Sequence, residues 1–414
     1  MKRFLLLLMV CTLTLSMFAV SAASAQELSG KIVWVTNRTD IADTLLTDMA
    51  NDFMALHPGT TVEVEGIKDV EQTMLTRMAA NEMPDVSLMI TSKLTKSDFA
   101  NYFLPLDDLG YTADDFYFYD YGVGDDGKLY GITPDMYTNC VFYNRATFEI
   151  AGIESVPRTL EELDAVCQKL LEAGIIPMAT SFRDSWPLRG WLSGYYTQIG
   201  MSGNADFLNE LVQSDLLFDD TEFGNLYTLN IARDFALKGY FEPELAAANW
   251  DNQRRDVLNN DIAMFYDGAW YGPQLVSTSG LPVEDCGAFP FPGAKVLTVS
   301  PNWFYGVAKN TKYPELAKAF LQYMLEDGRY ATILEVECTN KDILSDLPGL
   351  EELYSFGLPV MEMPNVPAEL IDILNKGLIS LDSVTQEYLL TSDPQSIIDK
   401  YNDKWQQAKE DLGL

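Results

Sequence analysis

Tryptophan side chains with polar neighbours are the residues of this sequence best suited to bind a ligand. Trp270 follows an acid and a small-residue bend in the stretch "MFYDGAWYGP". Trp186, Trp250 and Trp303 also stand beside Asp, Asn or Arg, at predicted loops or strand ends. For each Trp alone, core or surface packing is the default. Indole rings, however, pack on the apolar faces of sugars while Asn, Asp and Arg bind hydroxyls, so the polar company favours carbohydrate recognition.

The sequence gives little support for a catalytic site or a metal site. His57 is the single histidine and lies at a predicted helix end, so triad or dyad catalysis would depend on it alone. The stretch "DYGVGDDGKLYG" (120–131) lacks the Lys-Ser/Thr of a phosphate loop and the alternating acids and closing Glu of a calcium loop. We therefore predict no metal and no cofactor. The 61 acidic residues leave open a glycosidase that uses two carboxylates.

The first 25 residues have the features of a cleaved signal peptide. Lys2 and Arg3 precede an apolar run, and Ala23-Ser24-Ala25 supplies the small-residue cleavage pattern. An uncleaved membrane anchor is the alternative, because the apolar run is of marginal length for a span. Cys11 lacks the lead-in of a lipoprotein site, which argues against a lipid anchor. We expect an exported protein, in the periplasm or outside the cell.

Charge and cysteine spacing restrict the partners further. The formal net charge is −33, which argues against nucleic acid and anionic lipid, since both need a basic surface. Four cysteines follow the signal peptide without the close pairs of a zinc site. Export permits disulfides, so bridges and free thiols both remain open for Cys140, Cys167, Cys286 and Cys338.

Hydrophobic periodicity predicts the elements that position these side chains. Near the N-terminus, strands alternate with amphipathic helices, an order that indicates a parallel sheet with right-handed crossovers. The turn at 124–128 predicts a hairpin. The predicted strands there are 31–36, 61–67 and 84–90, and the helices are 40–59 and 70–83.

The rest of the chain is richer in helices. A helix over 159–174 should place Leu160, Leu163, Val166, Leu170 and Leu171 on one face. Trp34, inside a predicted strand, and Trp405, in the last helix, should pack in the core. Length and pattern together predict an α/β protein of two lobes with a ligand cleft between them. Further helices are expected within 205–238 and at 313–327, 367–378 and 393–413, and strands near 263–268 and 303–310.

The chain also resembles a known family. The most specific stretch is "GKLYGITPDMYTNCVFYNRATFEIAGIESVPRTLEELDAVCQKLLEAGIIPMA" (127–179), and weaker similarities include "MAANEMPDVSLM", "VLNNDIAMFYDGAW" and "NTKYPELAKAFLQYML". These motifs resemble the extracellular solute-binding proteins of bacterial carbohydrate ABC transporters, the family related to maltose-binding protein. The resemblance implies a monomeric binder, not an enzyme, that closes around a sugar and delivers it to membrane permease subunits.

The resemblance also implies a domain division. It predicts a periplasmic-binding-protein fold of the type II kind, with a multi-strand hinge and a first crossing near Tyr143-Asn144. One lobe would comprise 27–139 plus 287–337, and the other 140–286 plus 338–414.

The ligand site is carried over from the family residue by residue. Trp270 would stack on a sugar ring, and Asp267 would bind hydroxyls. The bulky "NWFYG" stands where many members have a small, Gly-rich segment, so a narrower cleft and a shorter ligand are possible consequences. The other residues expected at the site are Asn37, Asp40, Thr91, Ser92, Tyr137, Asn139, Trp186, Arg189, Trp250 and Trp303.

Two alternatives stay open at this point. A non-sugar solute, such as a polyamine or an organic anion, would use the same fold. Asp267 beside Trp270 could begin a cage for a cationic ligand, whereas the negative net charge makes an anion less natural. The other alternative is the two-carboxylate glycosidase, which would need two acids facing one cleft, one of them with a raised pKa.

Overall fold

The N-terminal lobe is built on a four-stranded sheet in the order β2-β1-β3-β9. The structure is a computed structural model that describes residues 28–343 and 345–414. β1 pairs in parallel with β2 and β3, as the alternating pattern predicted, and β9 joins antiparallel from much later in the chain. The strands are β1 (Gly30–Thr36), β2 (Thr60–Gly66), β3 (Val86–Met89) and β9 (Phe304–Val307).

Helices cover this sheet and enclose an aromatic core. The predicted helix at 40–59 is a π-helical turn, η1 (Ala42–Leu46), followed by α2 (Thr47–Leu56), which His57 ends as its C-cap. Trp34 is fully buried, as predicted, and packs 5.2 Å from Phe320, measured between ring centroids. The remaining helices of this lobe are α3 (Val70–Ala80), α4 (Phe99–Tyr102), α12 (Pro314–Leu325) and α13 (Arg329–Leu334).

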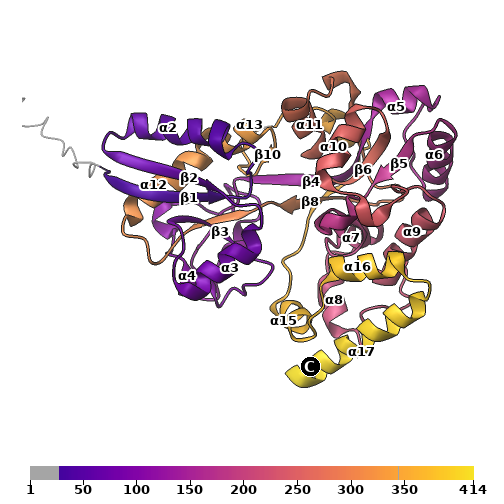
Figure 1. Ribbon diagram of the computed structural model, residues 1–414. Coiled ribbons are helices and arrows are strands. Elements are labelled where there is room, and N and C mark those ends of the chain that lie inside the picture. Colours follow the sequence, from indigo (N-terminus) through magenta and orange to yellow (C-terminus); the bar gives the residue numbers. More distant parts are fainter. Residues whose placement is uncertain (1–27, 344) are drawn as a thin grey trace, which may run out of the picture.

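The C-terminal lobe is built on a seven-stranded sheet around one long strand, β4 (Asp135–Asn144). Four strands from distant parts of the chain pair with β4, namely β6, β7, β8 and β10. Figure 1 shows β4 and β8 running side by side between the two lobes. The strands are β5 (Ile176–Ala179), β6 (Ile262–Gly268), β7 (Cys286–Phe289), β8 (Leu297–Pro301), β10 (Glu337–Cys338) and β11 (Val360–Glu362).

Helix α6 (Leu160–Glu172) shows how sequence and packing agree in this lobe. A capping box between Thr159 and Glu162 starts the helix where the sequence predicted it. The buried stripe is Leu163, Val166, Cys167 and Leu170. The expectation for Leu171 is wrong, because it is 40% exposed. It lies about 100° around the helix from Leu170, beyond the buried face.

The other helices of this lobe surround the sheet (Figure 1). Trp405 is fully buried, as predicted, and its indole N–H donates to the carbonyl oxygen of Ser214. These helices are α5 (Arg145–Ile150), α7 (Tyr196–Ser202), α8 (Phe207–Gln213), α9 (Asn225–Leu237), α10 (Trp250–Leu258), α11 (Tyr271–Ser279), α14 (Leu350–Tyr354), α15 (Ala368–Lys376), α16 (Leu381–Leu390) and α17 (Pro394–Leu412).

The predicted hairpin at 124–128 is only partly present. The chain turns there, with Gly124 N–H donating to the Lys128 carbonyl, but Val123 and Leu129 form a single isolated bridge. Ile132 instead pairs with Tyr305, so tertiary contacts with β9 replace the second arm of the hairpin.

The cysteine question is answered in favour of free thiols. Within the described residues Cys140, Cys167, Cys286 and Cys338 are all free and buried. The predicted signal peptide and Cys11 lie outside the described residues. No helix within those residues has the length and apolar character needed to cross a membrane.

Candidate functional site

Three of the singled-out tryptophans form one aromatic surface. The ring centroids of Trp186 and Trp250 lie 4.9 Å apart, those of Trp250 and Trp270 lie 5.8 Å apart, and those of Trp186 and Trp270 lie 6.2 Å apart. All three residues are half-buried, so part of each remains accessible to solvent. We call these three side chains the tryptophan cluster. Half-buried indoles are the form in which aromatic residues bind flat, partly apolar ligands.

Local structure explains why these rings meet. Trp270 follows the end of β6, where a Cβ on Gly268 would lie 2.4 Å from the Tyr137 ring and 2.6 Å from the Trp270 ring. Only glycine therefore allows this close approach. Trp250 is the first residue of α10, and its backbone N–H donates to the Asp184 carboxylate at 2.6 Å. This bond ties α10 to the 3₁₀ helix η4 (Phe182–Asp184). Ser185 joins η4 to the 3₁₀ helix η5 (Trp186–Trp191), which begins with Trp186.

Trp270 also lies where the two lobes meet. Its ring packs against the hydrophobic cluster around Trp34 in the N-terminal lobe. It packs as well against the cluster around Phe265 in the C-terminal lobe. Trp303, in the segment between β8 and β9, packs only against the first of these clusters, so it stands apart from the tryptophan cluster.

An ion pair between the fully buried Asp267 and the partly exposed Arg189 supports the tryptophan cluster. Arg189 donates to Asp267 from Nε at 2.9 Å and from Nη2 at 2.6 Å. Burial raises the pKa of Asp267, and the charge of Arg189 opposes that rise. The guanidinium lies 5.1 Å from the centre of the Tyr137 ring and 5.6 Å from that of Trp186. Asp267 thus holds Arg189 against the aromatic rings, and Tyr137 is buried beneath it.

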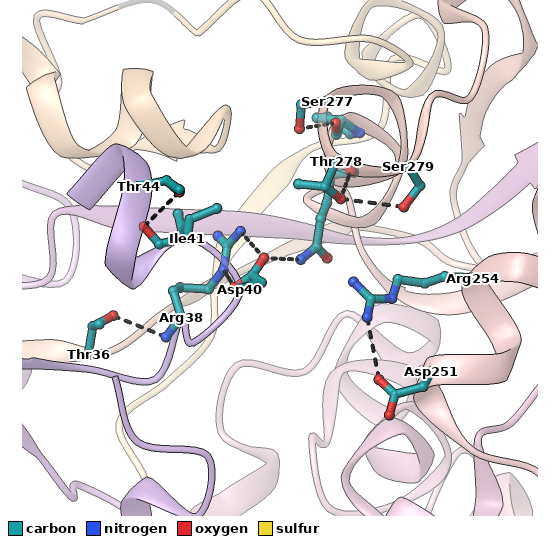
Figure 2. A network of polar contacts seen from close by, with 12 residues as sticks. Thr36, Arg38, Asp40, Ile41, Thr44, Asp251, Arg254, Ser277, Thr278 and Ser279 are labelled. Atoms are coloured by element: carbon teal, nitrogen blue, oxygen red, sulfur yellow. Dashed lines mark hydrogen bonds and ion pairs between the residues drawn. The ribbon is translucent and has the colours of Figure 1, made fainter. Parts of the chain in front are cut away.

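The loop after β1 reaches the other lobe. Asp40 accepts two hydrogen bonds of 2.9 Å from Arg38, and Gln274 Nε2 of α11 approaches its Oδ2 at 3.5 Å. Burial acts to raise the pKa of Asp40, but the hydrogen bond and charge of Arg38 outweigh it and hold that pKa below the usual value. Figure 2 shows Arg38 and Asp40 facing the helix that carries Thr278 and Ser279. Asn37 lies half-buried in the same loop.

Two acids from different lobes, Glu71 of α3 and Asp382 of α16, also act on each other. Ser193 donates to Asp382, and burial raises the pKa of Asp382 to about 6 despite that bond and the charge of Arg189. Glu71 of α3 adds to this rise, so its charge acts across the two lobes. Glu71 in turn accepts from Ser92, which is exposed after β3, with Thr91 half-buried beside it.

Asn139 is part of the strands between the lobes and not of the tryptophan cluster. Its side-chain amide donates to the Thr298 carbonyl at 3.1 Å and to the Ser300 hydroxyl at 2.8 Å, both on β8. It lines a separate small cavity of about 10 Å³ with Tyr196 and Thr298. Neither Asn139 nor Trp303 therefore belongs to the tryptophan cluster, although Asn139 lies opposite Gly268 in the pairing of β4 with β6.

Sequence reasoning missed several polar residues at the junction of the lobes. Asp135 accepts from Asn302 at 2.6 Å, and burial raises its pKa to about 7 against that bond and the charge of Arg38. No local pattern marks it, because its burial depends on strands far away in the sequence. Gln274 could have been found, since it follows Trp270 by one helical turn. Arg38, Glu71 and Asp382 were also not singled out.

A family model for bacterial extracellular solute-binding proteins matches residues 37–329. The chain belongs to that family. The resemblance stated from the sequence is thereby confirmed.

One curated relative is an uncharacterized ABC transporter extracellular-binding protein of Pyrococcus horikoshii, 28% identical over 189 residues. That match covers 45% of this chain and 40% of the relative, so it spans less than half of the relative's length.

Solved structures of sugar-bound proteins share the fold. The binding protein BlMnBP1 of an ABC transporter from Bifidobacterium animalis subsp. lactis, in complex with mannobiose, has a TM-score of 0.79 at 24% identity, covering 93% of this chain and 95% of that chain. A sugar transporter protein from Bacillus licheniformis, in complex with stachyose, has a TM-score of 0.68 at 16% identity, covering 92% of this chain and 100% of that chain. The likeness shows the expected two-lobe α/β fold.

Proposed function

We propose that this protein captures a mono- or oligosaccharide outside the cytoplasmic membrane and delivers it to the permease subunits of an ABC transporter. The tryptophan cluster beside Arg189, at the junction of the two lobes, is the observation that carries the proposal. Structural neighbours with mannobiose, mannotriose, raffinose or stachyose bound support the same ligand class.

The ligand would act by stabilising a closed arrangement of the lobes. A sugar that stacks on Trp270 and bonds to the loop after β1 touches both lobes, so it binds the closed form more tightly than the open one. The permease would then recognise the closed monomer with the sugar bound. In this cycle the protein binds and releases the sugar and catalyses no reaction. Export by a cleaved signal peptide, to a periplasm or beyond, belongs to the same proposal.

The predicted lobe boundaries remain part of the proposal. The division between 139 and 140 falls inside β4, the strand that joins the lobes. In the segment 287–337, β8 pairs with β4 while β9 pairs with β3. We infer that this segment crosses between the lobes after β8.

The polyamine alternative has less support than the sugar. A cationic ligand would need a free carboxylate among the aromatic rings. Asp267, the acid next to Trp270, is already paired with Arg189 at 2.6 Å. Spermidine therefore serves as the contrast in the test.

The test is a titration of intrinsic tryptophan fluorescence with mannobiose, mannotriose, raffinose, stachyose, a chitin oligosaccharide and spermidine. We expect the fluorescence change to saturate with at least one sugar. Trp270→Ala should lower the affinity for that sugar at least about ten-fold. Trp405→Phe should leave the affinity unchanged, because the Trp405 ring is buried and belongs to α17. Saturation by spermidine alone would overturn the carbohydrate proposal.

A further inference from the structure

A guanidinium and a carboxylate of the described chain lie close together beside the tryptophan cluster and form no ion pair with each other. Arg189 bonds to Asp267 from Nε and Nη2, and its Nη1 has no acceptor among the described residues. Asp382, in the first turn of α16, accepts at Oδ1 from the Ser193 hydroxyl, and within the same part of the chain its Oδ2 has no donor. The charge of Arg189 lowers the pKa of Asp382, so the two groups are near each other.

A ligand can reach both of these free atoms. The buried side-chain atoms that have no hydrogen-bond partner within the described residues do not include Arg189 Nη1 or Asp382 Oδ2, so both atoms are open to solvent. The Arg189 side chain is 30% exposed, and Asp382 is half-buried. The two residues therefore offer a ligand a free donor and a free acceptor close together.

Local structure holds the two groups in this arrangement. The Gly194 N–H donates to the Arg189 carbonyl at 2.8 Å, so the chain turns back after η5 and brings Ser193 near Arg189. Helix α16 packs against η5, which places Asp382 at that turn. Asp267 holds the guanidinium and Ser193 holds the carboxylate, so each group is fixed by a partner other than its neighbour.

A hydroxyl group is the ligand that fits this arrangement. A hydroxyl both donates and accepts, whereas an ionised carboxylate only accepts and a guanidinium only donates. One hydroxyl can therefore donate to Asp382 and accept from Arg189. An ammonium group would be repelled by Arg189, and an anion by Asp382, so the two residues together favour a neutral polar ligand.

The position of the two residues indicates a sugar hydroxyl. The Arg189 guanidinium lies 5.6 Å from the centre of the Trp186 ring, which belongs to the tryptophan cluster. A sugar ring stacked on that cluster carries its hydroxyl groups around its edge, where polar groups beside the rings meet them. Glu71 of the N-terminal lobe raises the pKa of Asp382, so the arrangement also lies where the lobes face each other.

We propose that Asp382 is a specificity-determining residue that accepts a hydrogen bond from one hydroxyl of a sugar stacked on the tryptophan cluster, while Arg189 donates to the oxygen of the same hydroxyl. This inference rests on the proposed function and names the groups that read a hydroxyl in its site. A sugar without that hydroxyl is rejected, because the donor and the acceptor both lose their shared partner.

The test measures sugar affinity by calorimetry for Asp382→Asn and for a matched control, Glu369→Gln. Glu369 is an exposed acid at the second residue of α15, as Asp382 is at the second residue of α16, so both substitutions remove one negative charge from the same helix position. The probe is whichever of mannobiose, mannotriose, raffinose and stachyose binds the wild type most tightly. We expect Asp382→Asn to weaken binding about ten-fold and Glu369→Gln less than about two-fold.

Monodeoxy analogues of the same sugar identify the hydroxyl. We expect one analogue to bind the wild type about ten-fold more weakly than the parent sugar, while Asp382→Asn binds the two within about three-fold. Asp382→Ala serves as a second variant with the same expected loss, and thermal unfolding checks that each variant is folded. Affinity unchanged in both variants, or every analogue losing the same factor in the wild type and in Asp382→Asn, overturns this inference.

The two proposals fail in different ways. If none of the four sugars binds the wild type, the proposed function fails and takes the inference with it. If a sugar binds and Trp270→Ala weakens it while neither variant of Asp382 does, the proposed function stands and only the role of Asp382 is overturned. Spermidine binding that Asp382→Asn weakens would also overturn the inference, because Asp382 would then pair with a cation and not with a hydroxyl.

Discussion

Arg189 and Asp267 determine how the tryptophan cluster is supported. Asp267 is fully buried at the end of β6, and its only charged hydrogen-bond partner among the described residues is Arg189. The guanidinium donates from two nitrogens and lies over two aromatic rings, a geometry that Lys could not reproduce. Removing the carboxylate would leave the guanidinium, whose side chain is only 30% exposed, without its counter-charge. The ion pair therefore holds the guanidinium in place against the Tyr137 and Trp186 rings.

Asp267→Asn tests this support. We expect the free energy of unfolding to fall by about 3 kcal/mol, because Arg189 loses its counter-charge. The matched control is Asp251→Asn, whose side chain is 73% exposed and lies 3.4 Å from Arg254, and its effect should stay below about 0.5 kcal/mol. Urea unfolding at pH 7 measures both, and equal effects of the two substitutions would contradict the supporting role.

At the scale of elements, the end of β6 and the start of α11 position Trp270. β6 runs beside β4, and Asn139 lies opposite Gly268 in that pairing. The absence of a side chain at Gly268 lets the Tyr137 and Trp270 rings come within reach of each other. The end of the strand thus places the Trp270 indole at the junction of the lobes. The helix that follows places Gln274 one turn after Trp270.

Gly268→Ala should disturb this junction. The added Cβ would lie 2.4 Å from the Tyr137 ring, so we expect a loss of about 1–3 kcal/mol in stability and weaker sugar binding. Gly200→Ala is the control, because its Cβ would meet only the Val296 carbonyl at 3.7 Å inside α7. That change should be neutral or stabilising by up to about 1 kcal/mol. Thermal unfolding measures both variants, and an equal loss of stability in the two would contradict this role of Gly268.

At the scale of the whole molecule, the segments that join the lobes contain buried acids. Asp135 lies at the start of β4 and accepts from Asn302 after β8. Glu337 of β10 accepts from the Thr138 N–H at 2.6 Å and from its hydroxyl at 2.9 Å. These carboxylates satisfy polar groups where strands from distant parts of the chain meet. Their burial raises the pKa of both.

Asp135 should make stability depend on pH. Its pKa is about 7 in the folded protein and near 4 when unfolded, so the folded state binds its proton more tightly. Its contribution is fully present below pH ~4 and is lost as the pH rises toward ~7.

The measurement compares the wild type with Asp135→Asn by urea unfolding across that range. Relative to the variant, the wild type should lose up to about 4 kcal/mol between pH 4 and pH 7. A difference that does not change with pH would contradict the raised pKa.

Local patterns were sufficient for several of the elements and for the family. Periodicity identified β1, α6 and α12 because each depends on neighbouring residues, and it placed Trp34 and Trp405 in the core for the same reason. The motifs of 127–179 identified the solute-binding family. Where local spacing was ambiguous, as at Leu171, the prediction failed by one position on the helix.

The arrangement of the candidate site was decided by tertiary structure. Trp186, Trp250 and Trp270 could be singled out by their neighbours, but their distances depend on how η5, α10 and β6 pack. The sequence suggested Asp267 as a ligand group, whereas packing pairs it with Arg189, 78 residues away. The contact between Asp40 and Gln274 exists only because a loop of one lobe meets a helix of the other. Periodicity is a property of neighbours along the chain, whereas a binding site depends on distances between residues that only the folded chain brings together.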